Sequence, residues 1–266
     1  MKWAYALPEN RRRGSFPRCL LFTDGDGADV AERLTKLVGL PGVHVRAEDF
    51  WMPRGLPVLM ATGKWDKSPI EEAKLEEWDG FLAEEQREEV TRWWLAVRER
   101  ANTPNWDIAS TCTIGDKVGL LLVEAKAHSA ELKKEGKPLA EDAPSASVKN
   151  HTQIGRAIVE ASGELNKAIA GWNLSRDSHY QLANRFAWAW KIASMGVPVV
   201  LVYLGFVGAT DVSDLGKPFA DGADWTSVVL EHSRGIVPGE VWGGEIKIGG
   251  ATIRPLIRVW EQRIPS

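Results

Sequence analysis

Residues 106–126 read WDIASTCTIGDKVGLLLVEAK, and this stretch decides how the rest of the chain can fold. Two strand-like runs, 106–110 and 118–123, flank the turn-forming residues 113–117, and this pattern predicts an antiparallel hairpin. The second run is apolar enough for a strand that is buried on both faces of a sheet. The sequence therefore predicts a hairpin whose second strand lies inside the protein.

Charged residues follow this buried run directly, although such residues are normally kept out of a core. Because side chains alternate along a strand, Glu124 and Lys126 share one face, about 7 Å apart. Pairing of the two strands can bring Asp107 beside Glu124. Two carboxylates and an ammonium at one sheet edge are the groups that a hard divalent cation and a phosphodiester require.

A Glu-x-Lys triplet alone carries little weight, because the chain contains five, which begin at residues 72, 124, 131, 135 and 245. The triplets at 72, 131 and 135 lie in strongly charged surroundings, and the one at 245 lies between glycine pairs. Only the triplet at 124 follows an apolar strand and has an aspartate upstream across a turn. The alternative, in which Glu124 and Lys126 merely mark where a core strand reaches water, stays open from spacing alone.

An aspartate, a hairpin and an apolar strand that ends in Glu-x-Lys resemble the PD-(D/E)xK phosphodiesterase superfamily, whose fold is restriction-endonuclease-like. The segments 122–128 (LVEAKAH) and 180–185 (YQLANR) also resemble a group of uncharacterised bacterial proteins within it. The resemblance covers about residues 106–208. It departs from the motif in one respect, since the aspartate follows Trp106 and the proline, Pro104, stands two residues upstream.

This resemblance implies a metal-dependent nuclease that hydrolyses phosphodiester bonds, with DNA favoured over RNA as its partner. Asp107 and Glu124 would hold Mg²⁺, for which Mn²⁺ can substitute, with the carbonyl of Ala125 as a further ligand. The ion would lower the pKa of a bound water and neutralise charge on the phosphate. Lys126 would orient the attacking water or stabilise the pentavalent phosphate.

A helix expected over residues 178–195 adds two candidates for substrate binding. Gln181 and Arg185 are four residues apart and share a helix face. The resemblance implies that they contact the phosphates or bases of the nucleic acid, and the alternative is a hydrogen-bonded pair on the helix surface. His128 and Glu131 follow the Glu-x-Lys triplet closely, and we expect them to be neighbours of the site without a catalytic role.

Two alternatives from other functional classes stand beside the nuclease. Residues 20–27 (LLFTDGDG) resemble the aspartate loop of haloacid-dehalogenase-like phosphatases, with Asp24 as nucleophile and Asp26 as acid and base. Residues 58–64 (VLMATGK) resemble the second, phosphate-holding motif of those enzymes. That assignment leaves Asp107, Glu124 and Lys126 unexplained. The second alternative is a non-catalytic nucleic-acid-binding module on a nuclease-like fold.

The composition restricts the setting of the protein. A net charge of −3 over 266 residues argues mildly against indiscriminate nucleic-acid binding. Two cysteines and the lack of a secretory segment predict free thiols in the cytoplasm. The apolar run 197–204 is too short to cross a bilayer, so no membrane partner is expected, and a homodimer is left open. We expect the arginines at 11–13 to form a solvated arm.

The order of the remaining elements predicts an α/β fold, in which a mixed central sheet is flanked by helices. The resemblance implies that its core is restriction-endonuclease-like. Residues 1–69 are expected to form an N-terminal extension packed on a core of residues 70–266, which ends in a hairpin. Within this scheme the expected strands are 18–23, 55–62 and 197–204, and the expected helices are 28–40, 152–170, 178–195 and 224–232. Residues 70–100 favour helix, 133–149 read as a mobile loop and 239–259 as the terminal hairpin.

Overall fold

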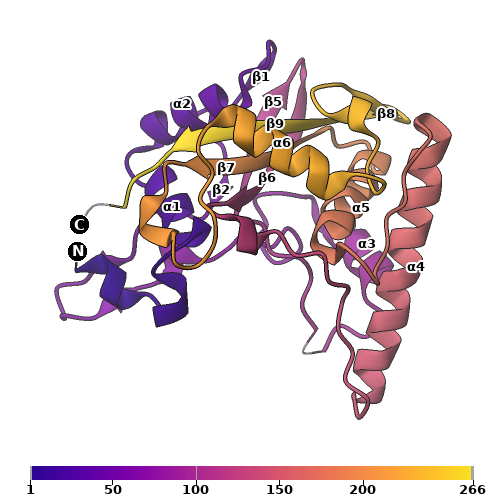
Figure 1. Cartoon of the computed structure of the whole chain (residues 1–266), viewed down its shortest axis with the longest axis horizontal. Helices are drawn as coiled ribbons and strands as arrows, with labels where there is room; N and C mark the ends of the chain where they lie inside the picture. The colour runs from indigo at the N-terminus through magenta and orange to yellow at the C-terminus, as the bar shows by residue number, and fades with distance from the viewer. Residues whose placement is uncertain (1, 100, 265–266) are drawn as a thin grey trace.

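The computed structural model describes residues 2–99 and 101–264, in which a seven-stranded sheet forms the centre of the molecule (Figure 1). Strands β5–β6 and β8–β9 pair antiparallel, whereas β6–β7 and β7–β9 pair parallel, so the sheet is mixed. Its order is β1 (Val43–His44), β5 (Ile108–Ile114), β6 (Lys117–Lys126), β7 (Val199–Val207), β9 (Ala251–Glu261) and β8 (Ile246–Ile248), with β2 (Trp51–Met52) also on β5. A separate two-stranded ribbon consists of β3 (Val58–Leu59) and β4 (Trp65–Asp66).

Helices cover both faces of the sheet. On one face, α1 and α2 pack against a core cluster that includes Leu121 and Val123 of β6; on the other, α3 to α6 pack against a cluster that includes Leu120 and Leu122. The helices are α1 (Ser15–Phe22), α2 (Gly27–Val38), α3 (Glu84–Trp94), α4 (Ser145–Ala168), α5 (Tyr180–Ser194) and α6 (Gly222–Ser233). Short 3₁₀ turns are η1 (Trp3–Ala6), η2 (Glu9–Arg11), η3 (Ser68–Ile70), η4 (Ser129–Glu131), η5 (Thr210–Val212) and η6 (Gly239–Val241). The prediction of an α/β fold with a mixed central sheet between helices is confirmed.

The predicted β5–β6 hairpin is present. Ile108 pairs with Val123 at its open end, and Ile114 pairs with Lys117 beside the turn. A two-residue turn of this kind needs a positive φ, which Gly115 supplies at 64°. Because β6 is buried from Gly119 to its end, its charged last residues lie inside the protein.

Four expectations about local structure are wrong. Residues 18–23 were expected to form a strand, but most of them lie in α1, where Pro17 occupies the first turn and needs no amide partner. The helix favoured across 70–100 is confined to α3, and the turns before it include Gly80, which lies too close to the ring of Phe50 to admit a Cβ. The strand expected over 55–62 is reduced to β3, and α4 begins at Ser145, inside the expected loop.

The segment before residue 70 is joined to the rest of the chain by the sheet and by polar contacts. Strands β1 and β2 both pair with β5, and Arg258 of β9 donates to the carbonyl of Val38 at 2.9 and 3.1 Å. The arginines expected in a free arm are engaged, since Arg11 pairs with Glu72 and Arg13 with Asp214. The division into 1–69 and 70–266 stays a prediction.

Across residues 2–99 and 101–264, the helices include none with the length and apolar character that crossing a bilayer demands.

Candidate active site

The open end of the hairpin brings the predicted carboxylates and the lysine together. Asp107 stands immediately before β5, and its Oδ2 accepts a 2.7 Å hydrogen bond from the backbone amide of Ala125. On the same strand, the ammonium of Lys126 forms an ion pair with Oε1 of Glu124. The register of the hairpin places Asp107 beyond Ile108, opposite the end of β6. The convergence expected from the sequence is therefore what the structure contains.

A second cation reaches Glu124 from α5. The Nε of Arg185 donates to Oε2 of Glu124 at 2.5 Å, so both oxygens of this carboxylate are engaged. Arg185 is 5% exposed and also donates to the carbonyl of Asn105 and the side chain of Asn184, at 2.6 and 2.9 Å. Its guanidinium lies 4.6 Å from the centre of the Trp106 ring. Arg185 is thus a buried, fixed partner of Glu124, and no surface pair with Gln181 is formed among the described contacts.

The two carboxylates have opposite protonation tendencies. Burial and the neighbouring Glu124 raise the pKa of Asp107 to about 7, and Lys126 offsets only part of this. Burial would also raise the pKa of Glu124, but Arg185 and Lys126 outweigh burial and hold it below its usual value. Burial disfavours the Lys126 ammonium, yet Glu124 and Asp107 raise its pKa. Near neutral pH Glu124 is therefore ionised, whereas Asp107 is present in both its protonated and its ionised form.

A polar cavity of about 780 Å³ opens over this group, and its lining includes Ser15 of α1 and part of the loop before α4. Asp107 and Lys126 line its wall with Gln181 and Arg185, whereas Glu124 is completely buried behind them. The wall carries five cationic and four acidic residues: Lys74, Lys126, Lys133, Lys137 and Arg185, and Glu72, Asp107, Glu131 and Glu135. With Glu124 behind the wall included, the formal charges balance, and Lys126 and Arg185 already pair with that carboxylate.

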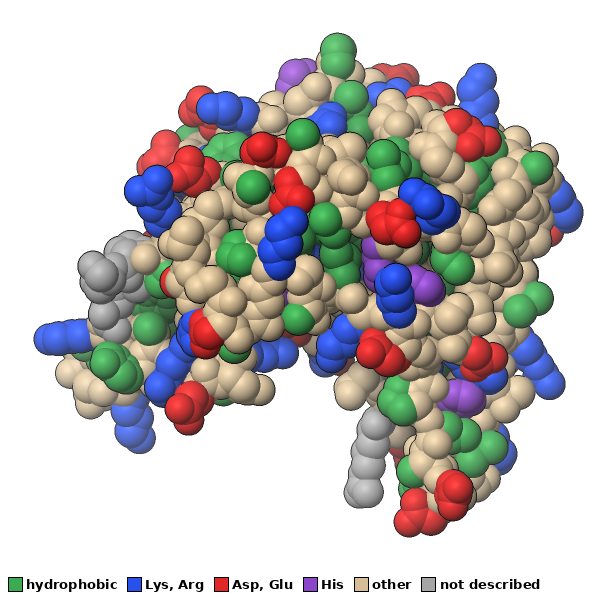
Figure 2. Space-filling view, viewed as in Figure 1, with side chains coloured by type: hydrophobic (Ala, Val, Ile, Leu, Met, Phe, Trp, Pro, Cys, Tyr) green, Lys and Arg blue, Asp and Glu red, His purple; other side chains and the backbone are tan. Residues whose placement is uncertain are grey.

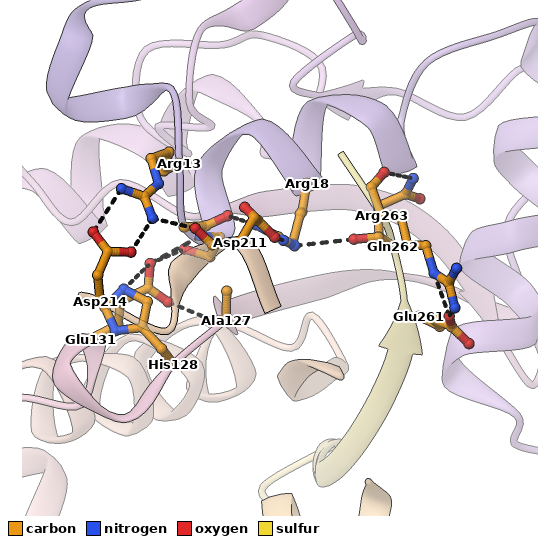
Figure 3. Close-up of polar contacts among 12 residues, drawn as sticks. Arg13, Arg18, Ala127, His128, Glu131, Asp211, Asp214, Glu261, Gln262 and Arg263 are labelled. Carbon is orange, nitrogen blue, oxygen red and sulfur yellow. Dashed lines mark hydrogen bonds and ion pairs between the residues drawn. The ribbon is translucent and has the colours of Figure 1, made fainter. Parts of the chain in front are cut away.

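Glu131 connects the end of β6 to helix α1 (Figure 3). Its carboxylate accepts hydrogen bonds from the amide of Ser15 at 2.9 Å and from the amide of Ala127 at 2.5 Å. Arg18 of α1 forms an ion pair with Asp211 and donates to the carbonyl of Gln262 at 3.0 Å. Figure 3 shows the labelled polar contacts around α1, and Ser15 at the start of this helix lines the cavity. Glu131 is a neighbour of the site, as expected, and its contacts are structural.

Residues outside the predicted set also belong to the site. Asn105 and Asn184 hold Arg185, and Tyr203 of β7 is the register partner of Glu124. The Tyr203 hydroxyl is buried and has no hydrogen-bond partner among the described residues, and burial together with Glu124 raises its pKa. Tyr203 could have been recognised from the sequence as a site residue, because it is the one polar side chain within the otherwise aliphatic run 199–204. The asparagines carry no such signal because only the fold brings them to Arg185.

The oxygen ligands of the site are of the type that a hard divalent cation binds, provided that Lys126 releases Glu124. Carboxylate and carbonyl oxygens are the ligands that Mg²⁺ accepts. Strand geometry directs the carbonyl of Ala125 to the same side as its amide, which Asp107 binds. Glu124 can join these ligands only if the Lys126 ammonium leaves its Oε1. Over residues 2–99 and 101–264, no three His, Cys, Asp or Glu side chains form a ready-made metal cluster.

The aspartates of the phosphatase alternative have structural contacts. Oδ1 of Asp24 accepts from the amide of Leu56 at 3.1 Å, and Asp26 caps α2 by accepting from the amide of Asp29 at 3.0 Å. The motif also follows a helix, α1, where a dehalogenase-like aspartate loop would follow a strand.

No family model, no curated protein and no solved structure matches this chain. A functional assignment therefore rests on the residues of the site, because a fold by itself does not define an activity.

Proposed function

We propose that the protein is a metal-dependent nuclease with a restriction-endonuclease-like core. One observation carries the proposal: Asp107 and Lys126 stand side by side on the wall of a polar cavity, with Glu124 directly behind them. A carboxylate pair with an adjacent ammonium matches the requirements of phosphodiester hydrolysis, in which negative charge builds on the phosphate. The antiparallel hairpin followed by a parallel strand supports the same assignment.

Each residue has a defined task in this proposal. Asp107 and the carbonyl of Ala125 hold Mg²⁺ or Mn²⁺, and Glu124 completes the ligand set. When bound, the ion supplies the acidity that activates a water molecule. Lys126, which remains an ammonium at neutral pH, turns from Glu124 to the phosphate. Arg185 keeps Oε2 of Glu124 in place and thereby positions it.

Nucleic acid, DNA in preference to RNA, is the partner that the cavity suits best. Lys74, Lys133 and Lys137 stand on its wall and can pair with consecutive phosphates, and the Gln181 amide can hydrogen-bond a phosphate or a base edge. Both cysteines, Cys19 and Cys112, are free and buried, which is compatible with the reducing cytoplasm that we propose as its location. A homodimer stays a prediction.

A cleavage assay tests the proposal. The substrates are plasmid, linear duplex, single-stranded DNA and RNA, each with Mg²⁺, with Mn²⁺ or with a chelator. We expect metal-dependent cleavage that Asp107→Asn and Glu124→Gln each reduce by about 10²-fold or more, as for the loss of a group that stabilises transition-state charge. Glu135→Gln is the matched control, because this exposed acid lines the same cavity away from the proposed ligands. Full activity in both site variants would contradict the assignment.

The role of Lys126 needs a second measurement. Because its ammonium competes with a cation for Glu124, Lys126→Met should leave Mn²⁺ binding intact or tighter while cleavage falls by a similar factor. Calorimetric titration of the variant with Mn²⁺ checks the first half of this statement. Loss of Mn²⁺ binding with cleavage unchanged would reverse the roles assigned to Lys126 and the carboxylates.

A further inference from the structure

One edge of strand β9 has no neighbouring strand beyond Pro255 in the described sheet. On its other edge β9 pairs with β7 from Ile253 to Glu261, whereas β8 covers only residues 251–253. The carbonyl of Pro255 accepts a 2.8 Å hydrogen bond from the amide of Gly243, which lies before β8. This bond shows that Pro255 directs its backbone groups away from β7, toward the open edge.

Ile257, Val259 and Glu261 follow Pro255 at intervals of two, so their backbone groups point to the same edge. The carbonyl of Ile257 accepts from the side chain of Arg258 at 3.0 Å. The three amides and the other two carbonyls have no hydrogen-bond partner within residues 2–99 and 101–264. A row of unpaired donors and acceptors on an edge strand is a template for an added strand.

This open edge forms the floor of a groove of about 570 Å³. Lys36 and Leu37 of α2 line one side of the groove, and Gly222 and Thr226 of α6 line the other. Figure 1 shows both helices beside the C-terminal half of β9. The five residues 257–261 offer about 17 Å of edge to an extended chain that lies between the two helices.

The α2 side of the groove is cationic. Arg258 donates to the carbonyl of the last residue of α2 at 2.9 and 3.1 Å, and the Lys36 ammonium lies 5.7 Å from the centre of the Trp260 ring. Neither cation has an ion-pair partner in the described part of the chain, whereas Glu261 is paired with Arg263 at 2.8 Å. Burial lowers the pKa of the Arg258 guanidinium, and no described carboxylate offsets this. Acidic side chains of a ligand would supply the missing partners.

The α6 side of the groove is small and apolar. Side chains alternate along a strand, so Ile257 and Val259 face α6 while Arg258 faces α2. Val259 is 36% exposed, and a Cβ on Gly222 would lie 3.5 Å from its side chain. An added strand would therefore meet apolar atoms on one face and unpaired cations on the other.

We infer that the open edge of β9 binds an extended segment of a partner protein in which acidic and small apolar residues alternate. The segment pairs with residues 257–261, its acidic side chains toward Lys36 and Arg258 and its apolar side chains toward Gly222 and Thr226. In strand addition the main-chain hydrogen bonds give affinity and the alternate side chains give specificity. This inference is independent of the proposed nuclease function.

A second copy of this chain fits the edge less well. A two-fold axis pairs each surface with itself, so β9 on β9 would bring the cationic α2 side of one copy against the same side of the other. Figure 2 shows apolar, basic and acidic side chains interspersed over this part of the surface, near α2, β9 and α6. The interfaces of obligate dimers are more hydrophobic than this.

The test uses the full-length protein and a labelled, end-blocked peptide of about eight residues in which Glu and Val alternate. A peptide that alternates Lys and Val is the comparison. Fluorescence anisotropy measures affinity, and hydrogen exchange with mass spectrometry reports the amides of residues 255–262. We expect the Glu-containing peptide to bind at least about 10-fold more tightly than the Lys-containing one, because like charges in contact are unfavourable. It should also slow exchange within residues 255–262.

Two variants examine the backbone and the charge separately. Val259→Pro removes an amide that points away from β7, at an edge position where proline is tolerated, and should weaken binding at least about 10-fold. Lys36→Glu changes an exposed side chain of the groove and should reverse the preference between the two peptides. Lys247→Glu, an exposed residue of β8 outside the groove, is the matched control and should leave binding unchanged. Circular dichroism confirms that each variant folds.

The remaining outcomes would overturn the inference. Failure of the wild type to bind the Glu-containing peptide, or equal affinity for both peptides, contradicts the chemistry assigned to the groove. Binding without slower exchange at residues 255–262 places the peptide elsewhere. If light scattering shows a wild-type dimer that Val259→Pro converts to a monomer, the occupant of the edge is a second copy of this chain and the inference is wrong.

Discussion

At the scale of single residues, the site depends on how three buried charged residues, Glu124, Lys126 and Arg185, and the half-buried Asp107 pair with one another. Glu124 is shared by two cations, while Asp107 has a backbone amide as its partner and lies within the field of Glu124. Environments that push two carboxyl pKa values apart are a recurring feature of catalytic pairs. The same difference has a measurable effect on stability, because a shifted pKa links protonation to folding.

Asp107→Asn should change how stability depends on pH. The pKa of Asp107 is about 7 in the folded protein, against about 3.9 when unfolded. The folded state therefore keeps a proton that the unfolded state loses, so this contribution is complete below about pH 4 and is lost as pH rises through 7. Relative to the wild type, Asp107→Asn should gain on the order of 1 to 3 kcal/mol between pH 4.5 and 7.5.

Urea unfolding with a chelator at several pH values measures that difference. Asp116→Asn is the control, since this exposed aspartate lies in the turn of the hairpin, far from the site. A stability difference that stays constant with pH would show that the Asp107 carboxyl titrates as it does in water.

Arg185→Met should be strongly destabilising. It leaves Glu124 buried with Lys126 as its remaining ion-pair partner, and breaking a buried ion pair on one side costs about 3–5 kcal/mol. Adding Glu124→Gln removes the uncompensated charge and should recover part of the loss, which a double-mutant cycle measures. The exposed Arg156→Met on α4 should stay within about 0.5 kcal/mol of wild type. Additive effects at 124 and 185 would contradict the coupling.

At the scale of elements, the packing of β6 against β7 sets the position of the site. A Cβ on Gly119 would lie 2.6 Å from the carbonyl oxygen of Pro198 and 2.6 Å from Cδ1 of Ile114. The bare backbone at residue 119 therefore lets the hairpin approach the strand that follows α5. Seven residue pairs then continue in register to Lys126 and Gly205.

Gly119→Ala should weaken this sheet. The methyl group meets the backbone carbonyl oxygen of Pro198, which cannot move aside, so overpacking should cost about 1–3 kcal/mol in the free energy of unfolding. Gly163→Ala on α4 is the control, because a Cβ there meets nothing within 4 Å and a helix gains up to about 1 kcal/mol from alanine. Equal denaturant midpoints for the two variants would contradict the assigned role of Gly119.

The elements differ in how far their sequence predicts them. The β5–β6 hairpin follows from alternation, an apolar run and a Gly-Asp turn, all of which are local signals. The strand predicted over residues 18–23 was wrong because a short apolar run fits a buried helix as well as a strand. Pro17 is compatible with the first turn of the helix that forms instead. The pairing of Arg185 with Glu124 lies beyond such reasoning, since the two residues are 61 positions apart and meet only through the fold.

At the scale of the whole molecule, segments that lie far apart in the chain build one cavity. The hairpin supplies Asp107 and Lys126, α5 supplies Gln181 and Arg185, and the N-terminal segment closes the wall with Ser15. The sequence predicted the contribution of Asp107 and Lys126 from spacing, and the resemblance implied that of Gln181 and Arg185. Neither could predict the contribution of the N-terminal segment, because Ser15 reaches the cavity through the Glu131 carboxylate, 116 residues away.

The central claim is that Asp107 and Glu124 bind the same divalent cation. Anomalous diffraction from a crystal of the protein grown with Mn²⁺ tests it most directly. The account predicts one peak within about 2–2.5 Å of an oxygen of each carboxylate, with the Lys126 ammonium moved away from Oε1 of Glu124. No peak at this position, with the Lys126–Glu124 ion pair intact in saturating Mn²⁺, would contradict the account.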